Sequence, residues 1–259
     1  MMSTAVKELV AFKHVGKVYD NGTVALRDIN FTIGEGEFMS FLGPSGCGKS
    51  TALRMVAGLE DVTSGSVMVG EKTPRQLTKE SNDIAFVFQE ANLLPWRTVL
   101  DNVILPLELR GGDRKAHKES AERVLEMVGL KDYFKAHPRE LSGGMKMRVS
   151  IARALAAKPK LLLMDEPFAA LDEITRQTLQ IELLDIWQRE KMTVLFVTHN
   201  VFEAVFLSTQ IAVMSARPGR VSSIIDVELP FPRVPSLRTD RVFNEYVEQA
   251  SGVLEHGSI

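Results

Sequence analysis

The sequence predicts an α/β protein whose central sheet is mostly parallel. Three apolar runs, "LLLMDEP", "TVLFVTH" and "IAVMSA", are bounded by polar or helix-breaking residues, which is typical of strands buried on both faces. A helical stretch with Leu179, Leu183 and Ile186 on one face separates the first two runs. A further apolar run, "EFMSFLG", leads into a glycine-rich loop and then a predicted helix. Strands and helices in this alternation predict a sheet with helices on both sides.

Short strands and turns are predicted in the first third of the chain. "INFTI" alternates Ile29, Phe31 and Ile33 with polar residues, as a half-buried strand does, and "GEG" at 34–36 predicts a turn. "EFMSFLG" predicts a buried strand, and a helix is expected to begin at Lys49. "SGSVMVGE" and "IAFVFQ" predict two further strands.

From about residue 92 to residue 158 the pattern is helical, with no convincing strand. "AERVLEMVGL" places Val124, Met127 and Val128 on one face, and Gly129 is expected to end that helix. We therefore expect one domain in four segments. They are a first part of the core over 1–91, a helical subdomain over 92–158, a second part of the core over 159–228, and a tail over 229–259 that contains a proline-rich linker and a short terminal helix.

Composition and charge are those of an ordinary globular chain. Of 259 residues, 45% are hydrophobic and 25% charged, and the formal net charge of −2 gives no general reason to expect a nucleic-acid partner. The single cysteine, Cys47, excludes an internal disulfide and fits a reducing compartment. The start, "MMSTAVKELV", lacks the apolar core of a signal peptide, and no apolar run is long enough to cross a bilayer. Any action at a membrane is therefore expected to require a partner.

The loop "GPSGCGKS" fits the pattern G-x-x-x-x-G-K-[ST], a phosphate-binding loop, between a predicted strand and a predicted helix. Its glycines let backbone N–H groups converge on phosphate oxygens at a helix N-terminus, so a chance glycine-rich turn is the weaker interpretation. Lys49 is expected to reach the β- and γ-phosphates, and Ser50 to bind Mg²⁺ through its hydroxyl. The candidate nucleotide-binding residues of the loop are Gly43, Pro44, Ser45, Gly46, Cys47, Gly48, Lys49, Ser50 and Thr51. We also expect the Cys47 thiol, beside Lys49 at a helix N-terminus, to favour the thiolate.

Two carboxylates follow the apolar run of "LLLMDE". Asp165 is expected to hold Mg²⁺, through a water molecule, and Glu166 to polarise an attacking water as general base. In isolation, two acids after a strand usually begin a solvated loop. Together with the phosphate-binding loop, they favour a phosphoryl-transfer site.

A second glycine-containing loop, "LSGGM", precedes a helix expected to reach about residue 157, with Val149, Ala152, Leu155 and Ala156 at buried-face spacing. Ser142 and the N–H groups of Gly143 and Gly144 would make its N-terminus a second anion site. Taken alone, the loop is more simply interpreted as an N-cap and a flexible turn.

The motifs Tyr19, "GPSGCGKST", Gln89, "LSGGM", "LLLMDEP", Leu171-Asp172 and His199 occur in one order along nearly the whole chain. In these motifs the chain resembles an ATP-binding-cassette (ABC) ATPase subunit. The resemblance implies a P-loop NTPase core with an antiparallel N-terminal β part and an inserted helical subdomain. It also implies a head-to-tail homodimer that encloses two ATP molecules, each held between the phosphate-binding loop of one chain and the "LSGGM" loop of the other.

Further roles are implied by this resemblance. Tyr19 is expected to stack on adenine, although an ordinary core or edge tyrosine is the alternative. Gln89 would contact Mg²⁺ and the attacking water, and His199 would contact the γ-phosphate, where a lone histidine is otherwise more often structural. Asp172 would make a contact across the dimer. The chain departs from the family pattern at Met145, Met147 and Asn200, where the family usually has Gln, Gln and Asp.

Together with "DEPFAALDEITR" and "EAVFLSTQIAVMSARPGR", the segment "EANLLPWRTVLDNVILPLELRG" resembles the nitrate, sulfonate and taurine importer ATPases. This implies a complex of two such chains with a membrane permease and an extracytoplasmic substrate-binding protein, at the cytoplasmic face of the inner cell membrane. Leu93, Leu94, Pro95 and Trp96 are candidates for the permease-docking surface, with ordinary packing as the alternative. A soluble ABC ATPase, such as one for iron–sulfur assembly, is the rival class. A small-molecule kinase leaves "LSGG" and His199 without a role.

Overall fold

The computed structural model describes residues 7–81, 83–216 and 218–256. The elements of its two sheets and their flanking helices are β1 (Glu8–Val18), β2 (Val24–Gly34), β3 (Phe38–Leu42), α1 (Lys49–Val56), β4 (Ser64–Val69), α2 (Pro74–Glu80), β5 (Ile84–Val87), β6 (Leu161–Asp165), α6 (Glu173–Glu190), β7 (Thr193–Thr198), α7 (Val201–Leu207), β8 (Gln210–Ser215) and β9 (Arg220–Asp226). Between β5 and β6 lie α3 (Val99–Glu108), α4 (Arg114–Met127) and α5 (Gly143–Ala156), and the chain ends in α8 (Arg241–His256). Short 3₁₀ helices occupy Lys131–Tyr133, Pro138–Glu140 and Pro235–Thr239.

The central sheet has six strands in the order β5-β6-β7-β3-β8-β9. All neighbouring pairs are parallel except β8 and β9, which are antiparallel. β3, β6 and β7 are buried along their whole length, which confirms the prediction from their continuous apolar runs. Because the carboxyl ends of parallel strands meet at one edge, the segments that follow β3, β5, β6 and β7 lie along the same edge of this sheet.

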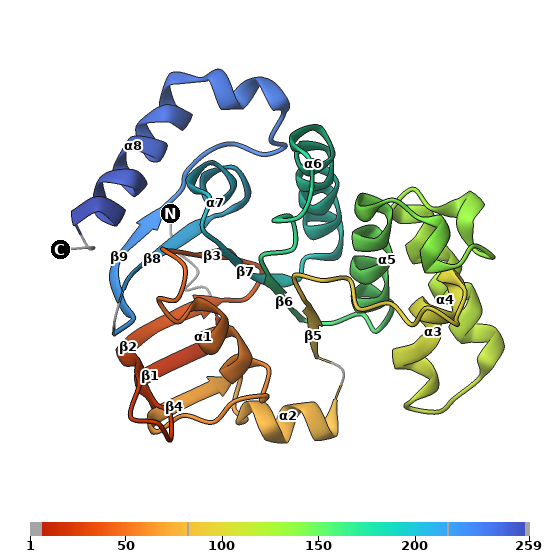
Figure 1. Ribbon diagram of the computed structural model, residues 1–259, viewed down its shortest axis with the longest axis horizontal. Helices are drawn as coiled ribbons and strands as arrows, with labels where there is room; N and C mark the ends of the chain where they lie inside the picture. The colour runs from red at the N-terminus through yellow and green to blue at the C-terminus, as the bar shows by residue number, and fades with distance from the viewer. Residues whose placement is uncertain (1–6, 82, 217, 257–259) are drawn as a thin grey trace.

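The N-terminal β part is a separate antiparallel sheet in the order β2-β1-β4, as the family resemblance implies. It lies beside the central sheet, with α1 against both (Figure 1). Phe12 of β1 and Phe31 of β2 stack with ring centroids 4.7 Å apart, and Phe41 of β3 contacts both rings edge-on. This aromatic packing joins the two sheets and fixes the base of α1.

The chain from Asn92 to Lys158 forms helices and no strand. In Figure 1, α3, α4 and α5 form a group beyond β5, at one side of the central sheet. Val103, Leu125 and Val149 are fully buried in a core that continues into the central sheet. Gly129 has φ 72° directly beyond the end of α4, so it ends that helix as predicted.

Sequence patterns missed four elements: β1, β9 and the two seven-residue helices α2 and α7. The register of β1 with β2 shifts between Phe12 and Val15 and again between Val15 and Lys17, which interrupts the alternation of its apolar side chains. β9 is an edge strand with mostly exposed or half-buried residues, and α2 is short. The terminal helix, expected to be short, has 16 residues in α8.

The C-terminal tail is packed against the core rather than extended from it. Arg233 is 3% exposed and donates hydrogen bonds to the carbonyl oxygens of Val205, Phe206 and Ser208 at 2.7–2.9 Å. These carbonyls belong to the end of α7, where helices leave acceptors unpaired. Phe243 of α8 is fully buried against α7.

In the part of the chain that the structure describes, no helix has both the length and the apolar character that crossing a membrane requires.

Candidate nucleotide-binding site

The phosphate-binding loop runs from the end of β3 to the start of α1. Gly46 and Gly48 have φ values of 77° and 97°, in the left-handed region that favours glycine. A Cβ atom at Gly48 would lie 2.5 Å from Leu26 Cδ2 and 3.0 Å from the carbonyl oxygen of Ala25, so a larger residue does not fit. No side chain caps α1 at Gly48. The first N–H groups of α1 are therefore available to an anion, as a phosphate site requires.

Lys49 is buried at the base of this loop, with 4% exposure. Its Nζ donates hydrogen bonds to the carbonyl oxygens of Gly43 at 2.7 Å and Pro44 at 2.9 Å. The loop backbone therefore curls around the ammonium group, which places one positive charge where the backbone N–H groups converge. This arrangement fits a phosphate ligand.

Ser50 and Asp165 bring two oxygen ligands together from α1 and from the end of β6. The Ser50 hydroxyl donates to Asp165 Oδ1 at 2.7 Å. Burial raises the pKa of Asp165, although this hydrogen bond and the nearby Arg54 oppose the effect. Hydroxyl and carboxylate oxygens suit Mg²⁺, which usually completes its shell with water and phosphate oxygens. Among residues 7–81, 83–216 and 218–256, no three His, Cys, Asp or Glu side chains form a metal site of their own.

Glu166 and His199 form a pair at the same edge. Glu166 Oε2 lies 2.8 Å from His199 Nδ1, and the Glu166 side chain is 19% exposed whereas that of His199 is 55% exposed. The Glu166 backbone has φ 45°, an unusual value for a non-glycine residue. Its N–H donates to the carbonyl oxygen of Val197, which fixes the chain directly after β6. Strain of this kind is commonly found at functional sites.

The phosphate-binding loop, the start of α1 and Glu166 border a cavity of about 510 Å³, whereas Asp165 and His199 are not part of its wall. Its wall includes Tyr19, whose hydroxyl lies 3.2 Å from Thr51 Oγ1, and the Lys17 ammonium lies 5.0 Å from the Tyr19 ring centroid. The remaining lining residues are Thr23, Val24, Ala25, Ser45, Gly46, Gly48, Lys49, Ser50, Thr51 and Glu166. The cavity thus combines an aromatic wall, a phosphate-binding loop and a carboxylate.

Other predicted site residues lie away from this cavity wall. Gln89 is exposed, two residues beyond the end of β5. Ser142 caps α5 by accepting from Met145 N at 3.3 Å. Asp172 caps α6 by accepting from Thr175 N at 3.0 Å, and this hydrogen bonding lowers the pKa of Asp172.

The N-termini of α5 and α6, capped by Ser142 and Asp172, lie against each other. A Cβ atom at Gly144 would lie 2.6 Å from Thr175 Cγ2, and one at Gly143 would lie 3.9 Å from Leu171 Cδ2. Sequence patterns gave no signal of this contact, because the segments lie far apart in the chain. The "LSGG" and Leu171-Asp172 segments therefore form one continuous surface.

The expectation of a reactive Cys47 is wrong. Cys47 is fully buried, and this burial raises the pKa of its thiol, outweighing Lys49, whose Nζ lies 3.9 Å from Cys47 Sγ. The Cys47 side chain packs inside the phosphate-binding loop as a small apolar group.

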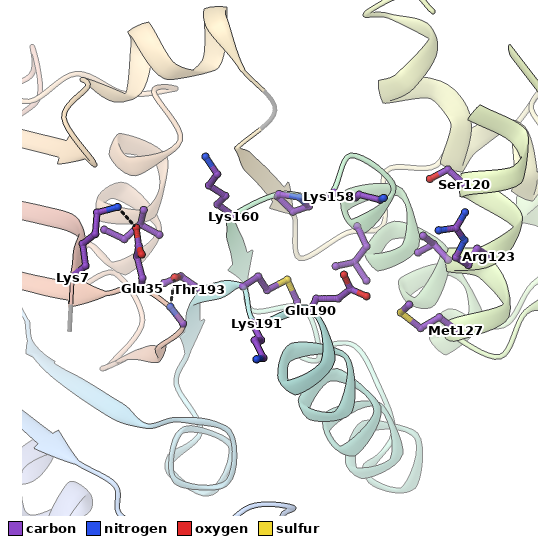
Figure 2. A pocket seen from close by; sticks show the side chains of 16 residues that line it. Lys7, Glu35, Ser120, Arg123, Met127, Lys158, Lys160, Glu190, Lys191 and Thr193 are labelled. Carbon is purple, nitrogen blue, oxygen red and sulfur yellow. Dashed lines mark hydrogen bonds and ion pairs between the residues drawn. The ribbon is translucent and has the colours of Figure 1, made fainter. Parts of the chain in front are cut away.

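A second cavity of about 550 Å³ lies at the opposite edge of the sheet, at the amino ends of β3, β6 and β7 (Figure 2). On its wall, Lys191 directly follows α6 and Lys158 lies two residues beyond the end of α5, where a cation offsets the helix dipole. Lys7 is paired with Glu35 at 2.7 Å, and Lys160 with Asp83 at 3.2 Å. Two of these four lysines are therefore paired with carboxylates and two lie at helix C-termini, and Arg123 is a further cation on the wall.

The ABC transporter family matches residues 26–169, a span that contains every motif from the phosphate-binding loop to Glu166. The chain belongs to the ABC transporter family. An ABC transporter ATP-binding protein of Methanocaldococcus jannaschii is 46% identical over 253 residues, which cover 96% of this chain and 92% of the relative. The aliphatic sulfonates import ATP-binding protein SsuB of Bacillus cereus is 41% identical over 254 residues, covering 96% and 97%.

Solved ABC structures agree with this fold. A dimeric structure of the ATP-binding cassette MJ0796, in a post-hydrolysis state bound to ADP and Pi, superposes with a TM-score of 0.74 at 36% identity. The match covers 86% of this chain and all of that one. The family membership establishes an ABC transporter ATPase, which binds ATP and couples its hydrolysis to transport.

Two departures from the ABC family pattern have structural explanations. Met147 is 4% exposed and packs in the core of the helical subdomain, where a polar amide would need a partner. Asn200 caps α7 by accepting from Glu203 N at 3.3 Å, a role that Asp fills equally well. Thr23, Val24 and Ala25 also line the cavity beside the phosphate-binding loop, and no sequence motif marks them.

Proposed function

We propose that this chain is the ATP-hydrolysing subunit of an importer for a small solute of the nitrate, sulfonate or taurine type, driven by ATP-dependent closure of a homodimer. The placement of Ser50, Asp165, Glu166 and His199 on one sheet edge carries the proposal for the chemistry. The similarity to SsuB along nearly the whole chain supports the importer assignment.

In this proposal each residue at the edge has one task. The phosphate-binding loop and Lys49 bind the phosphates, and Tyr19 stacks on the adenine. Ser50 and Asp165 hold Mg²⁺, with Gln89 completing the site, and the bound ion would neutralise charge on the phosphates. Glu166 accepts a proton from the attacking water, while His199 orients Glu166 and contacts the γ-phosphate.

The other half of each site belongs to a second copy of the chain. Ser142 and Gly143 are exposed at the start of α5, away from the cavity, as expected if this helix start meets a nucleotide held by the partner, and Gly144 is buried behind them. Asp172 lies beside them and is placed to contact the partner. The dimeric structure of the related cassette supports this arrangement.

The permease-docking surface is proposed to lie on the helical subdomain. Trp96 is 73% exposed and Leu109 79% exposed, whereas Leu93 packs partly against the core. Large exposed apolar side chains of this kind mark interaction sites. The assembled complex would include a membrane permease and an extracytoplasmic substrate-binding protein, with this subunit at the cytoplasmic face of the inner membrane.

The test is reconstitution of the chain with its permease and substrate-binding protein in liposomes. We expect uptake of taurine, an alkanesulfonate, nitrate or bicarbonate to depend on ATP. Trp96→Ala should weaken permease association and uptake while leaving the melting temperature and ATP binding unchanged, because the side chain is exposed. Leu59→Ala, an exposed apolar change outside the helical subdomain, is the control. Full activity without any permease would favour the soluble class instead.

A further inference from the structure

A buried polar cluster connects the C-terminal tail with the turn that carries His199. At its centre is Glu203 of α7, which is 7% exposed. Glu203 Oε2 accepts from Thr198 Oγ1 at 2.6 Å, and Oε1 accepts from Gln180 Nε2 at 3.2 Å. Arg176 Nε lies 3.5 Å from the same Oε1. The carboxylate is therefore held by groups from β7 and α6.

On one side, the cluster fixes the turn between β7 and α7. The Thr198 hydroxyl donates to Glu203 and accepts from Asn200 N at 3.0 Å. The Asn200 side chain in turn accepts from Glu203 N at 3.3 Å. His199 lies between Thr198 and Asn200, so both of its neighbours are bound to Glu203. The direction of the imidazole toward Glu166 follows from this turn.

On the other side, the cluster reaches the tail. Gln180 is 1% exposed, and its Oε1 accepts from Arg238 Nη2 at 2.5 Å. The Arg238 guanidinium lies 3.7 Å from the centre of the Phe206 ring. An amide this deeply buried needs both of its hydrogen-bonding ends satisfied, so Arg238 determines how Gln180 presents its N–H to Glu203.

The same cluster reaches the start of α6. Arg176 Nη2 donates to the carbonyl oxygen of Leu171 at 2.9 Å, directly before Asp172. Arg176 also pairs with Glu173 at 3.0 Å. The cluster therefore joins the tail to both the His199 turn and the Asp172 turn.

We propose that Arg238 and Gln180 are positioning residues for ATP hydrolysis: through Glu203 and Thr198 they hold the His199 turn in place. The tail is thereby part of the hydrolytic machinery, and a partner that withdraws Arg238 from Gln180 lowers turnover. This inference rests on the role proposed above for His199.

Arg238 is not needed to attach the tail. Arg233 anchors the tail through three hydrogen bonds to α7 carbonyls, and Phe243 and Ala250 of α8 are fully buried. Loss of the Arg238 guanidinium should therefore leave the tail docked. Its effect should appear at His199 rather than in the fold.

The experiment compares Arg238→Met, which keeps an unbranched stem over Phe206, with Arg238→Lys and with Arg241→Met. Arg241 is a tail arginine whose side chain is 91% exposed and paired only with Glu245 among the residues that the structure describes. The readouts are ATPase kinetics, the melting temperature, and the imidazole resonances of ¹⁵N-histidine-labelled protein, in which His199 is identified by its loss in His199→Gln.

We expect Arg238→Met to shift the His199 resonance and to lower kcat roughly 2- to 30-fold at an unchanged KM for ATP. Arg238→Lys should recover part of the activity, and Arg241→Met should change nothing. Gln180→Met should reproduce the effect of Arg238→Met, and it replaces that variant if Arg238→Met does not fold.

An unmoved His199 resonance in folded Arg238→Met protein would overturn the inference. A shifted resonance with unchanged kcat would also overturn it, because the contact would then not affect hydrolysis. If wild-type protein hydrolyses ATP and His199→Gln is as active as wild type, the role proposed for His199 fails instead, even if the resonance shifts.

Discussion

At the scale of single residues, the pair Glu166–His199 places the strongest constraint on the chemistry. The left-handed backbone at Glu166 directs its carboxylate toward the cavity wall, and the 2.8 Å contact with His199 fixes one of its two oxygens. The other oxygen is left for a water molecule. This geometry fits the general-base role proposed for Glu166, with His199 as the orienting group.

Glu166→Gln should bind ATP and hydrolyse it roughly 10²–10⁴ times more slowly, because an amide cannot accept the proton. With hydrolysis blocked, the protein should elute as a dimer in ATP and as a monomer in ADP during size-exclusion chromatography. Glu190→Gln, an exposed change at the opposite edge of the sheet, is the matched control. Wild-type turnover in Glu166→Gln would remove Glu166 from this role.

Cys47 should react slowly with iodoacetamide in the folded protein, because the thiol is fully buried and its pKa is raised. The chain has one cysteine, so mass spectrometry reports this site without ambiguity. The comparison is the labelling rate of the same protein unfolded in guanidinium chloride. Equal rates in the two states would show that the thiol is accessible.

At the scale of elements, the sequence was sufficient for strands buried on both faces and for the helices with clear stop signals. The runs of β6 and β7, and Gly129 beyond α4, carry their own signals. β1 was harder, because its irregularities near His14 break the alternation. The tail was underestimated because what holds it, Arg233 on the carbonyls of α7, is a contact between segments distant in the chain.

The candidate site likewise has features that sequence patterns predict and features that they do not. The phosphate-binding loop, the acids after β6 and the histidine after β7 could be placed together, because parallel strands bring their carboxyl ends to one edge. The contact between Gly144 and Thr175 and the cluster around Glu203 could not be predicted. Both depend on how helices pack in three dimensions, which no local pattern encodes.

The close approach at the start of α5 predicts different effects for its two glycines. Gly144→Ala should destabilise the protein by about 1–3 kcal/mol, because the new Cβ would meet Thr175 Cγ2 at 2.6 Å. Gly143→Ala should be close to neutral, since its Cβ would lie 3.9 Å from the nearest neighbouring side chain. Urea denaturation of both variants measures the difference, and equal stabilities would contradict this packing.

At the scale of the whole molecule, the proposed mechanism has one chain supply two half-sites that face different nucleotides. The cavity with the phosphate-binding loop and the surface formed by Ser142, Gly143 and Asp172 are separate features of the same chain. In the proposed mechanism, a complete site therefore requires two chains. Defects in the two half-sites should compensate when placed in different chains.

Gly143→Asp should leave ATP binding to the single chain intact and prevent closure of the dimer, because its carboxylate repels the partner's γ-phosphate. Gly143 is a better position for this test than Gly144, because a substitution at Gly144 would also disturb Thr175. Mixing Gly143→Asp with Lys49→Ala should restore some hydrolysis, since each mixed dimer keeps one intact site.

If strict coupling between the two sites abolishes hydrolysis in the mixed dimer, cross-linking can still test whether the "LSGG" loop contacts the nucleotide of the partner chain. A photoreactive γ-phosphate analogue held by a tagged chain should label Ser142→Cys in the untagged chain. Labelling confined to the chain that holds the nucleotide would show that the "LSGG" loop acts within its own chain.

The strand order also has a consequence for biosynthesis. β3 lies between β7 and β8, which are encoded much later, so the centre of the sheet cannot form until β8 has left the ribosome. At about 5–20 residues per second, that wait is on the order of ten seconds. During this wait the largely apolar strand Phe38–Leu42 has no permanent neighbour, while β1, β2 and β4 are already available to pair. The nascent chain therefore carries an aggregation-prone strand that ribosome-associated chaperones would need to shield.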